Sequence, residues 1–324
     1  MENTTENKTV AVKMVEIDAD QAGQRIDNYL LSRLKGAPKS LIYRILRKGE
    51  VRVNKGRIKP DYRLQAGDIV RIPPVRVGEA RPDNRPAERD LLRIENSIIY
   101  EDKRLFIINK PSGLAVHGGS GLSYGIIEAL RTLRPDAPFL ELVHRLDRET
   151  SGCLIIAKKR SALRLLHELL RNNQVDKQYL TLVKGEWKGG DRRIEAPLRK
   201  NTLRSGERMV IVSEDGKEAR SLFRPLCVNA RASLMQVKLD TGRTHQIRVH
   251  AVHSGHPIAG DEKYGDEAFN TSMKALGLKR LFLHAVSLRF TMPDDGQRIA
   301  ITAPLPVELS KVLQKLDLRY QLAT

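Results

Sequence analysis

Residues 143–157 read VHRLDRETSGCLIIA, a polar head followed by an apolar tail. The tail, Gly152 to Ala157, is typical of a buried strand, and the head should form a loop that leads into it. Asp147 would then be held at the mouth of a rigid strand, with Arg145 and Arg148 on either side. Cations favour an ionised carboxylate, which can act as a nucleophile or as a base. A structural ion pair at a loop explains the pattern equally well, so the motif alone leaves both interpretations open.

Around this motif, strand and helix patterns follow one another without a regular order. Further buried strands are expected at residues 105–109, 179–183, 233–239 and 281–290. Helices are expected at residues 124–133, 161–171, 244–253 and 306–319. Because helices do not alternate strictly with strands, a doubly wound parallel sheet is not indicated. The sequence instead predicts an α+β domain with a large mixed, mostly antiparallel sheet.

The N-terminal part of the chain carries much of its positive charge. The net charge is +18, and residues 22–77 hold 14 Lys and Arg against 4 Asp and Glu. A chain this basic is expected to bind a polyanion, either a nucleic acid or an anionic membrane surface. A solvated basic face with no partner is the alternative.

A helical period in this basic stretch predicts helices at residues 25–34 and 41–47. We expect Ser40 to cap the second helix and Gly49 to end it. Short strands are then expected at residues 51–53 and 68–72, with a turn at residues 54–56.

Several classes of protein are disfavoured by composition. No run of about 18 apolar residues exists, so no membrane span is expected. Residues 1–10 are polar and lack the apolar core of a signal peptide, which predicts a cytoplasmic location. Cys153 and Cys227 lie far apart and form no CxxC pair, so we expect buried, reduced thiols rather than a disulfide or a thiolate zinc site.

Two further patterns in the sequence have some features of a cofactor or metal site. Residues 117–125 are rich in glycine, but they lack the Lys-Ser/Thr pair of a phosphate loop, and no GxGxxG follows a strand. An ATPase or a dinucleotide enzyme is therefore poorly supported. Four histidines lie close together at positions 245, 250, 253 and 256, but no acid or Cys is interleaved and Arg243 and Arg248 would repel a metal ion. RNA contact or ordinary packing is the favoured interpretation.

Five blocks, in order along the chain, resemble the motifs of one known family. The run HRLDRETSG at residues 144–152 is similar to the catalytic motif of RNA pseudouridine synthases of the ribosomal large-subunit type. The other blocks are NKPSG with VHG, KQY, TGRTHQIRVH and GDEKYG, at residues 109–113, 116–118, 177–179, 241–250 and 260–265. The likeness extends from about Gly23 to the C-terminal helix.

This resemblance implies a pseudouridine synthase fold preceded by a small domain similar to the RNA-binding domain of ribosomal protein S4. The implied division is a tail and first strand at 1–20, the S4-like domain at 21–76, a linker at 77–92 and the catalytic domain at 93–324. The implied activity is isomerisation of specific uridines in 23S rRNA to pseudouridine, by base flipping and with no cofactor or metal. We expect a cytoplasmic monomer whose partner is 23S rRNA.

The family motifs also imply roles for individual residues. Asp147 would be the essential carboxylate, acting on the anomeric carbon, on the uracil ring or on a ribose proton. Tyr179 would pack against the flipped base and offer a hydroxyl, and Arg248 would pair with Asp147. Arg145 would enter the RNA helix where the target base leaves it, offsetting part of the cost of flipping.

Cations of the N-terminal domain are expected to bind phosphates, which raises affinity without reading sequence. The residues expected to contact RNA are Lys39, Arg44, Arg47, Lys48, Arg52 and Lys55. Two rival functions stay open. A non-catalytic RNA-binding protein of ribosome assembly would not need Asp147. A hydrolase would use Asp147 to release the base, although retaining glycosidases use two carboxylates and only Glu149 is close in sequence.

Overall fold

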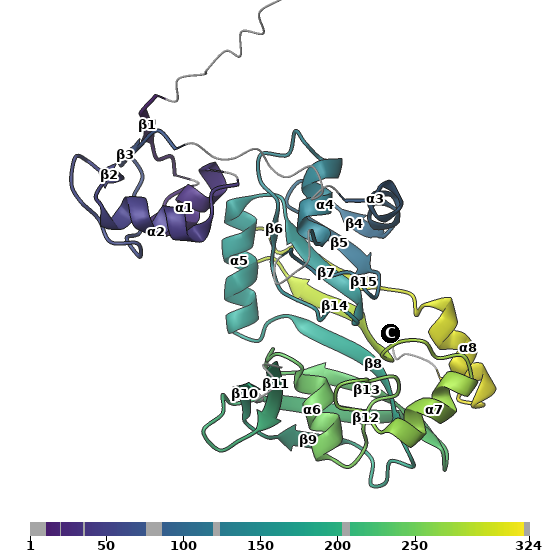
Figure 1. The fold of residues 1–324 in the computed structure, drawn as a ribbon. Coiled ribbons are helices and arrows are strands. Elements are labelled where there is room, and N and C mark those ends of the chain that lie inside the picture. The colour runs from purple at the N-terminus through teal and green to yellow at the C-terminus, as the bar shows by residue number, and fades with distance from the viewer. Residues whose placement is uncertain are drawn as a thin grey trace, which may run out of the picture. The chain divides into compact units, whose positions relative to one another are not determined.

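The structure is a computed structural model that describes residues 11–19, 21–34, 36–75, 86–118, 124–202 and 208–320. The chain divides into two compact units, residues 1–84 and 85–324 (Figure 1). Each unit has its own hydrophobic core. The domain limits expected from the sequence stay a prediction, and most of the expected linker lies outside the described residues. Residues 88–92 of that expected linker belong to helix α3 (Glu88–Glu95).

The N-terminal unit packs two helices against a small antiparallel sheet in the order β1-β3-β2. Its elements are β1 (Lys13–Glu16), α1 (Ile26–Arg33), α2 (Lys39–Arg47), β2 (Arg52–Val53) and β3 (Ile69–Ile72). The apolar residues at helical spacing, Ile26, Tyr29 and Leu30 in α1 and Ile42 and Ile45 in α2, are buried in one core. Their burial confirms the helical period expected from the sequence.

In this unit the predicted turn and the predicted end of α2 are confirmed, whereas the predicted N-cap of α2 is wrong. Asn54 and Lys55 form the expected turn with φ of 48° and 67°, and Gly49 follows α2 with φ of 69°. Ser40 is not the N-cap residue, because α2 begins at Lys39 and Pro38 takes that position without a side-chain hydrogen bond. Pro38 has an extended backbone, with ψ of 146°, and its side chain has no group that could accept a hydrogen bond from the first turn.

The second unit is built on one large sheet, which has ten strands within the described residues. Along the sheet the order is β4-β5-β7-β14-β8-β13-β12-β9, and β15 and β6 pair with β14 and β7. The bounds are β4 (Ile98–Glu101), β5 (Leu105–Lys110), β6 (Glu141–Leu142), β7 (Ser151–Ala157), β8 (Asp176–Lys184), β9 (Arg192–Glu195), β12 (Arg220–Val228), β13 (Ala232–Leu239), β14 (Leu283–Thr291) and β15 (Arg298–Thr302). Only the pair β7–β14 is parallel among these described strands, so the prediction of a mixed, mostly antiparallel sheet is confirmed.

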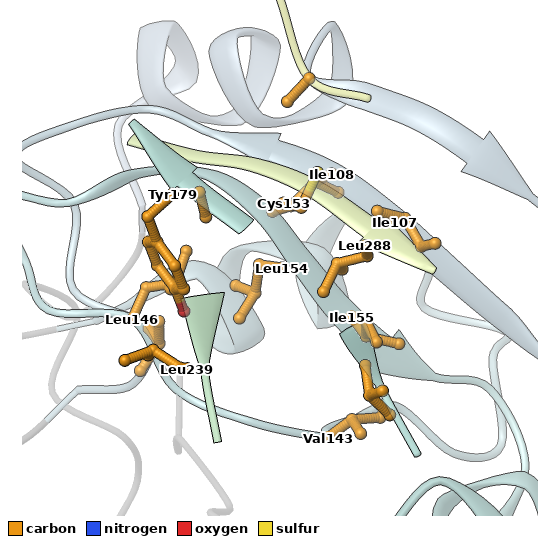
Figure 2. Close-up of a cluster of buried hydrophobic side chains, with 14 of the residues drawn as sticks. Ile107, Ile108, Val143, Leu146, Cys153, Leu154, Ile155, Tyr179, Leu239 and Leu288 are labelled. Atoms are coloured by element: carbon orange, nitrogen blue, oxygen red, sulfur yellow. The ribbon is translucent and has the colours of Figure 1, made fainter. Parts of the chain in front are cut away.

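Strand β7 is central, and all seven of its residues are buried. Figure 2 shows Cys153, Leu154 and Ile155 of β7 among apolar side chains that include Ile108 and Leu288. Burial raises the pKa of the Cys153 thiol to about 12, so this thiol stays protonated. The apolar tail that the sequence predicts as a buried strand is therefore an interior strand of the sheet.

Helices flank this sheet, and a separate hairpin lies beside α6 (Figure 1). The remaining elements are α4 (Ile126–Leu133), α5 (Arg160–Arg171), β10 (Leu198–Thr202), β11 (Arg208–Val212), α6 (Gln246–His253), α7 (Glu267–Ala275) and α8 (Val307–Lys315). Helix α5 packs on β7, while α7 and α8 enclose a second apolar cluster with Leu182 and Leu234. In the described part of the chain, no helix combines the length and apolarity needed to cross a membrane.

Strands β9 and β12 were not expected from the sequence. In β9 three of the four residues are exposed and charged, which hides any apolar alternation. The pairing of β9 with β12, and of β12 with β13, makes these segments strands.

Candidate active site

Asp147 lies in the loop between β6 and β7, and several contacts fix that loop. The Asp147 carbonyl accepts a hydrogen bond from the Thr150 N–H at 3.1 Å, closing a tight turn. The neighbouring Leu146 side chain is buried in the core cluster. Ser112 Oγ donates to the Glu149 carbonyl at 2.7 Å, which ties the loop to the segment after β5. Asp147 is therefore carried by a defined turn rather than by a free loop.

Lys110 anchors the same loop from inside the protein. Its side chain is completely buried, and Nζ lies 2.9, 2.7 and 2.9 Å from the carbonyls of Pro111, Leu114 and Arg148. Three acceptors match the three protons of an ammonium group. Burial lowers the pKa of Lys110 to about 7, opposed by the charges of Glu149 and Asp147.

Strand β7 meets β14 very closely where the loop ends. Gly152 has φ of 107°, and a Cβ placed there would lie 2.2 Å from the Ala285 carbonyl oxygen. Only glycine fits this position. Beside it, Arg280 Nη2 donates to Ser151 Oγ at 3.0 Å, and Ser151 Oγ lies 2.9 Å from His284 Nδ1. These contacts fix the C-terminal end of the Asp147 loop.

Two side chains from one distant segment approach the Asp147 carboxylate. Arg248 Nη1 lies 3.7 Å from Asp147 Oδ2, and His245 Nε2 lies 3.9 Å from the same oxygen. About a quarter of the Asp147 side chain is exposed, so a substrate can reach it. The two arginines next to Asp147 in the sequence have other surroundings. Arg148 contacts the Gly113 carbonyl and Glu149, and Arg145 is exposed.

Arg248 is itself held by a second carboxylate that sequence reasoning had not singled out. Its Nε and Nη2 donate to Asp261, each at 2.7 Å, and both side chains are buried. The N–H groups of Lys263 and Tyr264 also donate to Asp261. Burial alone would raise the pKa of Asp261, but Arg248 and these N–H groups hold it below its usual value. The one available signal was the position of Asp261 within the GDEKYG block.

His245 precedes α6 in the left-handed backbone region, with φ of 54° and ψ of 20°. Its Nδ1 lies 2.8 Å from the Tyr264 hydroxyl, which accepts a hydrogen bond from the Val210 N–H at 2.9 Å. Burial lowers the pKa of His245 below its ordinary value, although the charge of Asp147 opposes this shift. At neutral pH the ring is therefore uncharged. The sequence offered His245 only as a packing or RNA-contact residue.

Tyr179 lies on β8, in the middle of the sheet, where its neighbours are Val237 and Ala285. Figure 2 shows its ring beside Leu146 and Leu239. Burial and the charge of Asp147 raise the pKa of the Tyr179 hydroxyl well above its ordinary value. The structure thus brings Asp147, Arg248 and Tyr179 into one neighbourhood from three separate parts of the chain.

The residues expected to contact RNA lie at the surface. In the N-terminal unit all six expected RNA contacts are exposed, namely Lys39, Arg44, Arg47, Lys48, Arg52 and Lys55. The clustered histidines have separate surroundings: His250 is buried against Ser221 and the Ala196 carbonyl, whereas His256 packs on Trp187. Within the described residues, no three His, Cys, Asp or Glu side chains are grouped to hold a metal ion.

Comparison with known proteins shows the family of this chain. The family model described as RNA pseudouridylate synthase matches residues 104–253, and the S4 domain model matches residues 24–70. Ribosomal large subunit pseudouridine synthase C of Pasteurella multocida (strain Pm70) is 60% identical over 309 residues, covering 94% of each chain. The chain belongs to the RNA pseudouridine synthase family. Ribosomal large subunit pseudouridine synthase C of Escherichia coli (strain K12) is 56% identical over 312 residues, which are 95% of this chain and 98% of that one.

Solved structures of the RNA pseudouridine synthase family share the fold. Human RNA Pseudouridylate Synthase Domain Containing 4 has a TM-score of 0.59 and 26% identity, and the match covers 71% of this chain and 97% of that chain. Human RNA Pseudouridylate Synthase Domain Containing 1 has a TM-score of 0.57 and 25% identity, and the match covers 74% of this chain and 94% of that chain. The chain is therefore an isomerase with a pseudouridine synthase domain and an N-terminal S4 domain, as the sequence motifs predicted.

Proposed function

We propose that this enzyme isomerises specific uridines of 23S rRNA to pseudouridine, with Asp147 as the essential carboxylate. The single observation that supports this role best is the placement of Asp147, on a fixed turn with Arg248 Nη1 3.7 Å from Oδ2. Ribosomal RNA as substrate is inferred from the names of the relatives and from the exposed cations of the N-terminal unit. We also propose a cytoplasmic monomer, with the domain limits expected from the sequence.

The reaction breaks the bond from ribose to a uracil nitrogen, turns the base and rejoins it through a ring carbon. The product has the same atoms as the substrate, so no redox partner or group donor enters. Asp147 can act on the anomeric carbon, on the uracil ring or on a ribose proton. The Tyr179 ring would pack against the flipped base, and its hydroxyl would serve as a proton donor or acceptor.

Base flipping requires a group that occupies the vacated space in the RNA. Arg145 is exposed two residues before Asp147, so its guanidinium can extend from the loop that carries the carboxylate. Unstacking a base costs a few kcal/mol, and a planar guanidinium that stacks or bonds phosphate can offset part of that cost. Arg145 would therefore act on the RNA.

The direct test is to incubate the protein with an unmodified 23S transcript and to map pseudouridine by chemical labelling and primer extension. Wild type should create defined sites, and Asp147→Asn should create none. Asp136→Asn is the matched control, because Asp136 is exposed and outside the site. Undiminished modification by Asp147→Asn would overturn the catalytic role and favour a rival function.

Mass measurement distinguishes the isomerase from a hydrolase. Isomerisation leaves the mass of the RNA unchanged, whereas hydrolysis releases uracil and leaves an abasic site. We expect no free uracil after incubation with wild type. Its stoichiometric release would show that Asp147 serves a glycosidase.

A further inference from the structure

Both side chains that approach the Asp147 carboxylate point at the same oxygen. Arg248 Nη1 and His245 Nε2 lie 3.7 and 3.9 Å from Oδ2, and no interaction of Oδ1 is recorded with any described residue. A carboxylate held through one oxygen keeps the lone pairs of the other for a substrate. The charge of Arg248 is accounted for by the proposed mechanism, whereas the role of His245 is not.

The Tyr264 hydroxyl determines which nitrogen of His245 carries the proton. A phenol has one proton and accepts through its oxygen. Because the Val210 N–H already donates to that oxygen, the hydroxyl proton is free to donate to His245 Nδ1, 2.8 Å away. If Nδ1 instead carried the proton, the hydroxyl proton of Tyr264 would have no acceptor among the residues that the structure describes. In the neutral ring the proton is therefore on Nε2, the nitrogen that faces Asp147.

The backbone of His245 is strained in a way that supports a specific role. A non-glycine residue at φ of 54° is uncommon, and such conformations cost on the order of 1–3 kcal/mol and concentrate at functional sites. This conformation comes directly before α6, so His245 and Arg248, one helical turn apart, both reach Asp147. The strain is thus associated with placing two donors on one oxygen.

We propose that His245 is a positioning residue which, with its tautomer fixed by Tyr264, anchors Oδ2 of Asp147 together with Arg248 and leaves Oδ1 to react. This inference rests on the proposed function of Asp147. The distance of 3.9 Å is longer than a hydrogen bond. Catalytic hydrogen bonds are often long in the free enzyme and shorten when substrate is bound. His245 acts through Asp147 and takes no part in bond making.

The test compares three substitutions in the full-length protein. His245→Gln keeps an N–H donor near the position of Nε2, whereas His245→Asn tolerates the left-handed backbone and can still meet Tyr264 but cannot reach Asp147. Tyr264→Phe removes only the hydroxyl and keeps the ring that lies 4.9 Å from the Arg248 guanidinium. His253→Asn, at an exposed histidine of α6, is the control.

Single-turnover rates and RNA affinity should be measured for each variant. We expect His245→Asn to lower the rate by at least about tenfold, equivalent to 1.4 kcal/mol of barrier, with RNA affinity unchanged. His245→Gln should stay within about threefold of wild type, and Tyr264→Phe should fall between them. Equal rates for His245→Asn and wild type, while Asp147→Asn is inactive, would overturn this inference and leave the proposed function standing. Full activity of Asp147→Asn would overturn both.

A spectroscopic measurement tests the same idea without relying on rates. In wild-type protein labelled with ¹⁵N-histidine, the His245 signals should report a neutral ring protonated at Nε2. Tyr264→Phe should shift them towards a mixture of tautomers, and the signals missing from His245→Asn assign the residue. A wild-type ring protonated at Nδ1, or no change in Tyr264→Phe, would contradict the proposed positioning.

Discussion

Arg248 is fixed by Asp261 through two hydrogen bonds of 2.7 Å, and its third nitrogen, Nη1, is the one that faces Asp147. The planar fork of a guanidinium makes this division of labour possible, because two nitrogens orient the group and the third is left to act. A lysine, with a single nitrogen, could not both bind Asp261 in this way and face Asp147. The carboxylate that orders the site is thus Asp261, while the carboxylate proposed to react is Asp147.

Replacing Asp261 should therefore affect both stability and rate. Breaking one partner of a buried ion pair costs about 3–5 kcal/mol, so Asp261→Asn should lower the free energy of unfolding by this order. The freed guanidinium would no longer face Asp147 correctly, and the single-turnover rate should fall at least about tenfold. Urea unfolding and rate measurements check this. Glu141→Gln breaks the exposed pair with Arg131 and should change stability by less than about 1 kcal/mol. An unaltered unfolding midpoint in Asp261→Asn would contradict the expectation.

The contact between β7 and β14 predicts a strong difference between two glycines. In Gly152→Ala the new Cβ would meet the Ala285 carbonyl, and with φ of 107° the backbone would also be strained. We expect little folded protein. Gly185→Ala is the control: its φ is also positive, at 73°, but no atom lies within 4 Å of the added carbon. That variant should fold and lose roughly 1 kcal/mol from its backbone conformation alone. Circular dichroism after purification measures both, and a stable, active Gly152→Ala would refute the packing argument.

Lys110 predicts a pH dependence of stability. Burial lowers the pKa of its ammonium group to about 7 in the folded protein, from an ordinary value of 10.5. Between pH 7 and pH 10.5 the unfolded chain binds this proton more tightly than the folded protein does. The contribution of Lys110 to the free energy of unfolding is therefore fully present above pH 10.5 and is lost as the pH falls towards 7. Each pKa unit corresponds to about 1.4 kcal/mol, which gives a change of a few kcal/mol.

The measurement compares urea unfolding of wild type and Lys110→Met from pH 6.5 to 10. The stability of wild type relative to the variant should rise across this range. A constant difference would mean that the three carbonyls keep Lys110 protonated when folded, against the predicted shift. In either case the variant loses the three hydrogen bonds that anchor the Asp147 loop, and its rate should fall.

Two substitutions of Tyr179 distinguish a role in packing from a role in proton transfer. Among the described residues no hydrogen bond of its hydroxyl is recorded, so Tyr179→Phe keeps the ring and should change stability by no more than about 0.5 kcal/mol. If the hydroxyl transfers a proton, the single-turnover rate should fall by roughly 100-fold. Tyr179→Leu should in addition lose stability, because the ring packs beside Leu146 and Leu239. A Phe variant with the wild-type rate would limit Tyr179 to packing.

The exposed cations of α2 should act through salt-dependent affinity. For the triple variant Arg44→Ala, Arg47→Ala and Lys48→Ala, each lost phosphate contact should reduce the slope of log affinity against log salt by about 0.7–0.9. Filter binding to 23S rRNA between low and high salt measures the slope. Three exposed lysines of the catalytic unit, Lys274, Lys279 and Lys311, replaced together by Ala, control for charge alone. Equal slopes for both triple variants would show that α2 has no special role.

Local sequence determined a large part of this fold. The apolar run at residues 152–157 is buried along its whole length, and the spacing of Ile26, Tyr29 and Leu30 produced a buried helical face. Such elements can be predicted because their patterns depend on residues that are close in the chain: the period of a helix, or the apolar run of a buried strand. The motif blocks likewise pointed to Asp147, Tyr179 and Arg248 as members of one site, and the roles of these residues stay predictions.

Strands β9 and β12, the capping of α2 and helix α3 could not be obtained in this way. Exposed, charged strands such as β9 form because a partner strand accepts their backbone hydrogen bonds, and no local pattern records that partner. The same is true of Asp261, which gave no signal apart from its motif block. Its pairing with Arg248 exists only because the chain brings α6 and the segment after it together.

The sequence by itself determined that Asp147 lies in a polar loop before a buried strand, because the unbroken apolar run of residues 152–157 follows that loop. It suggested that Arg145 and Arg148, the neighbours in the chain, would surround the carboxylate. The family motif implied Arg248 as a partner of Asp147, and only the tertiary structure showed that Arg248 and His245 both approach the carboxylate at Oδ2. The physical reason is that side chains next to each other in a loop point apart, whereas opposing side chains converge when separate elements pack around a common sheet.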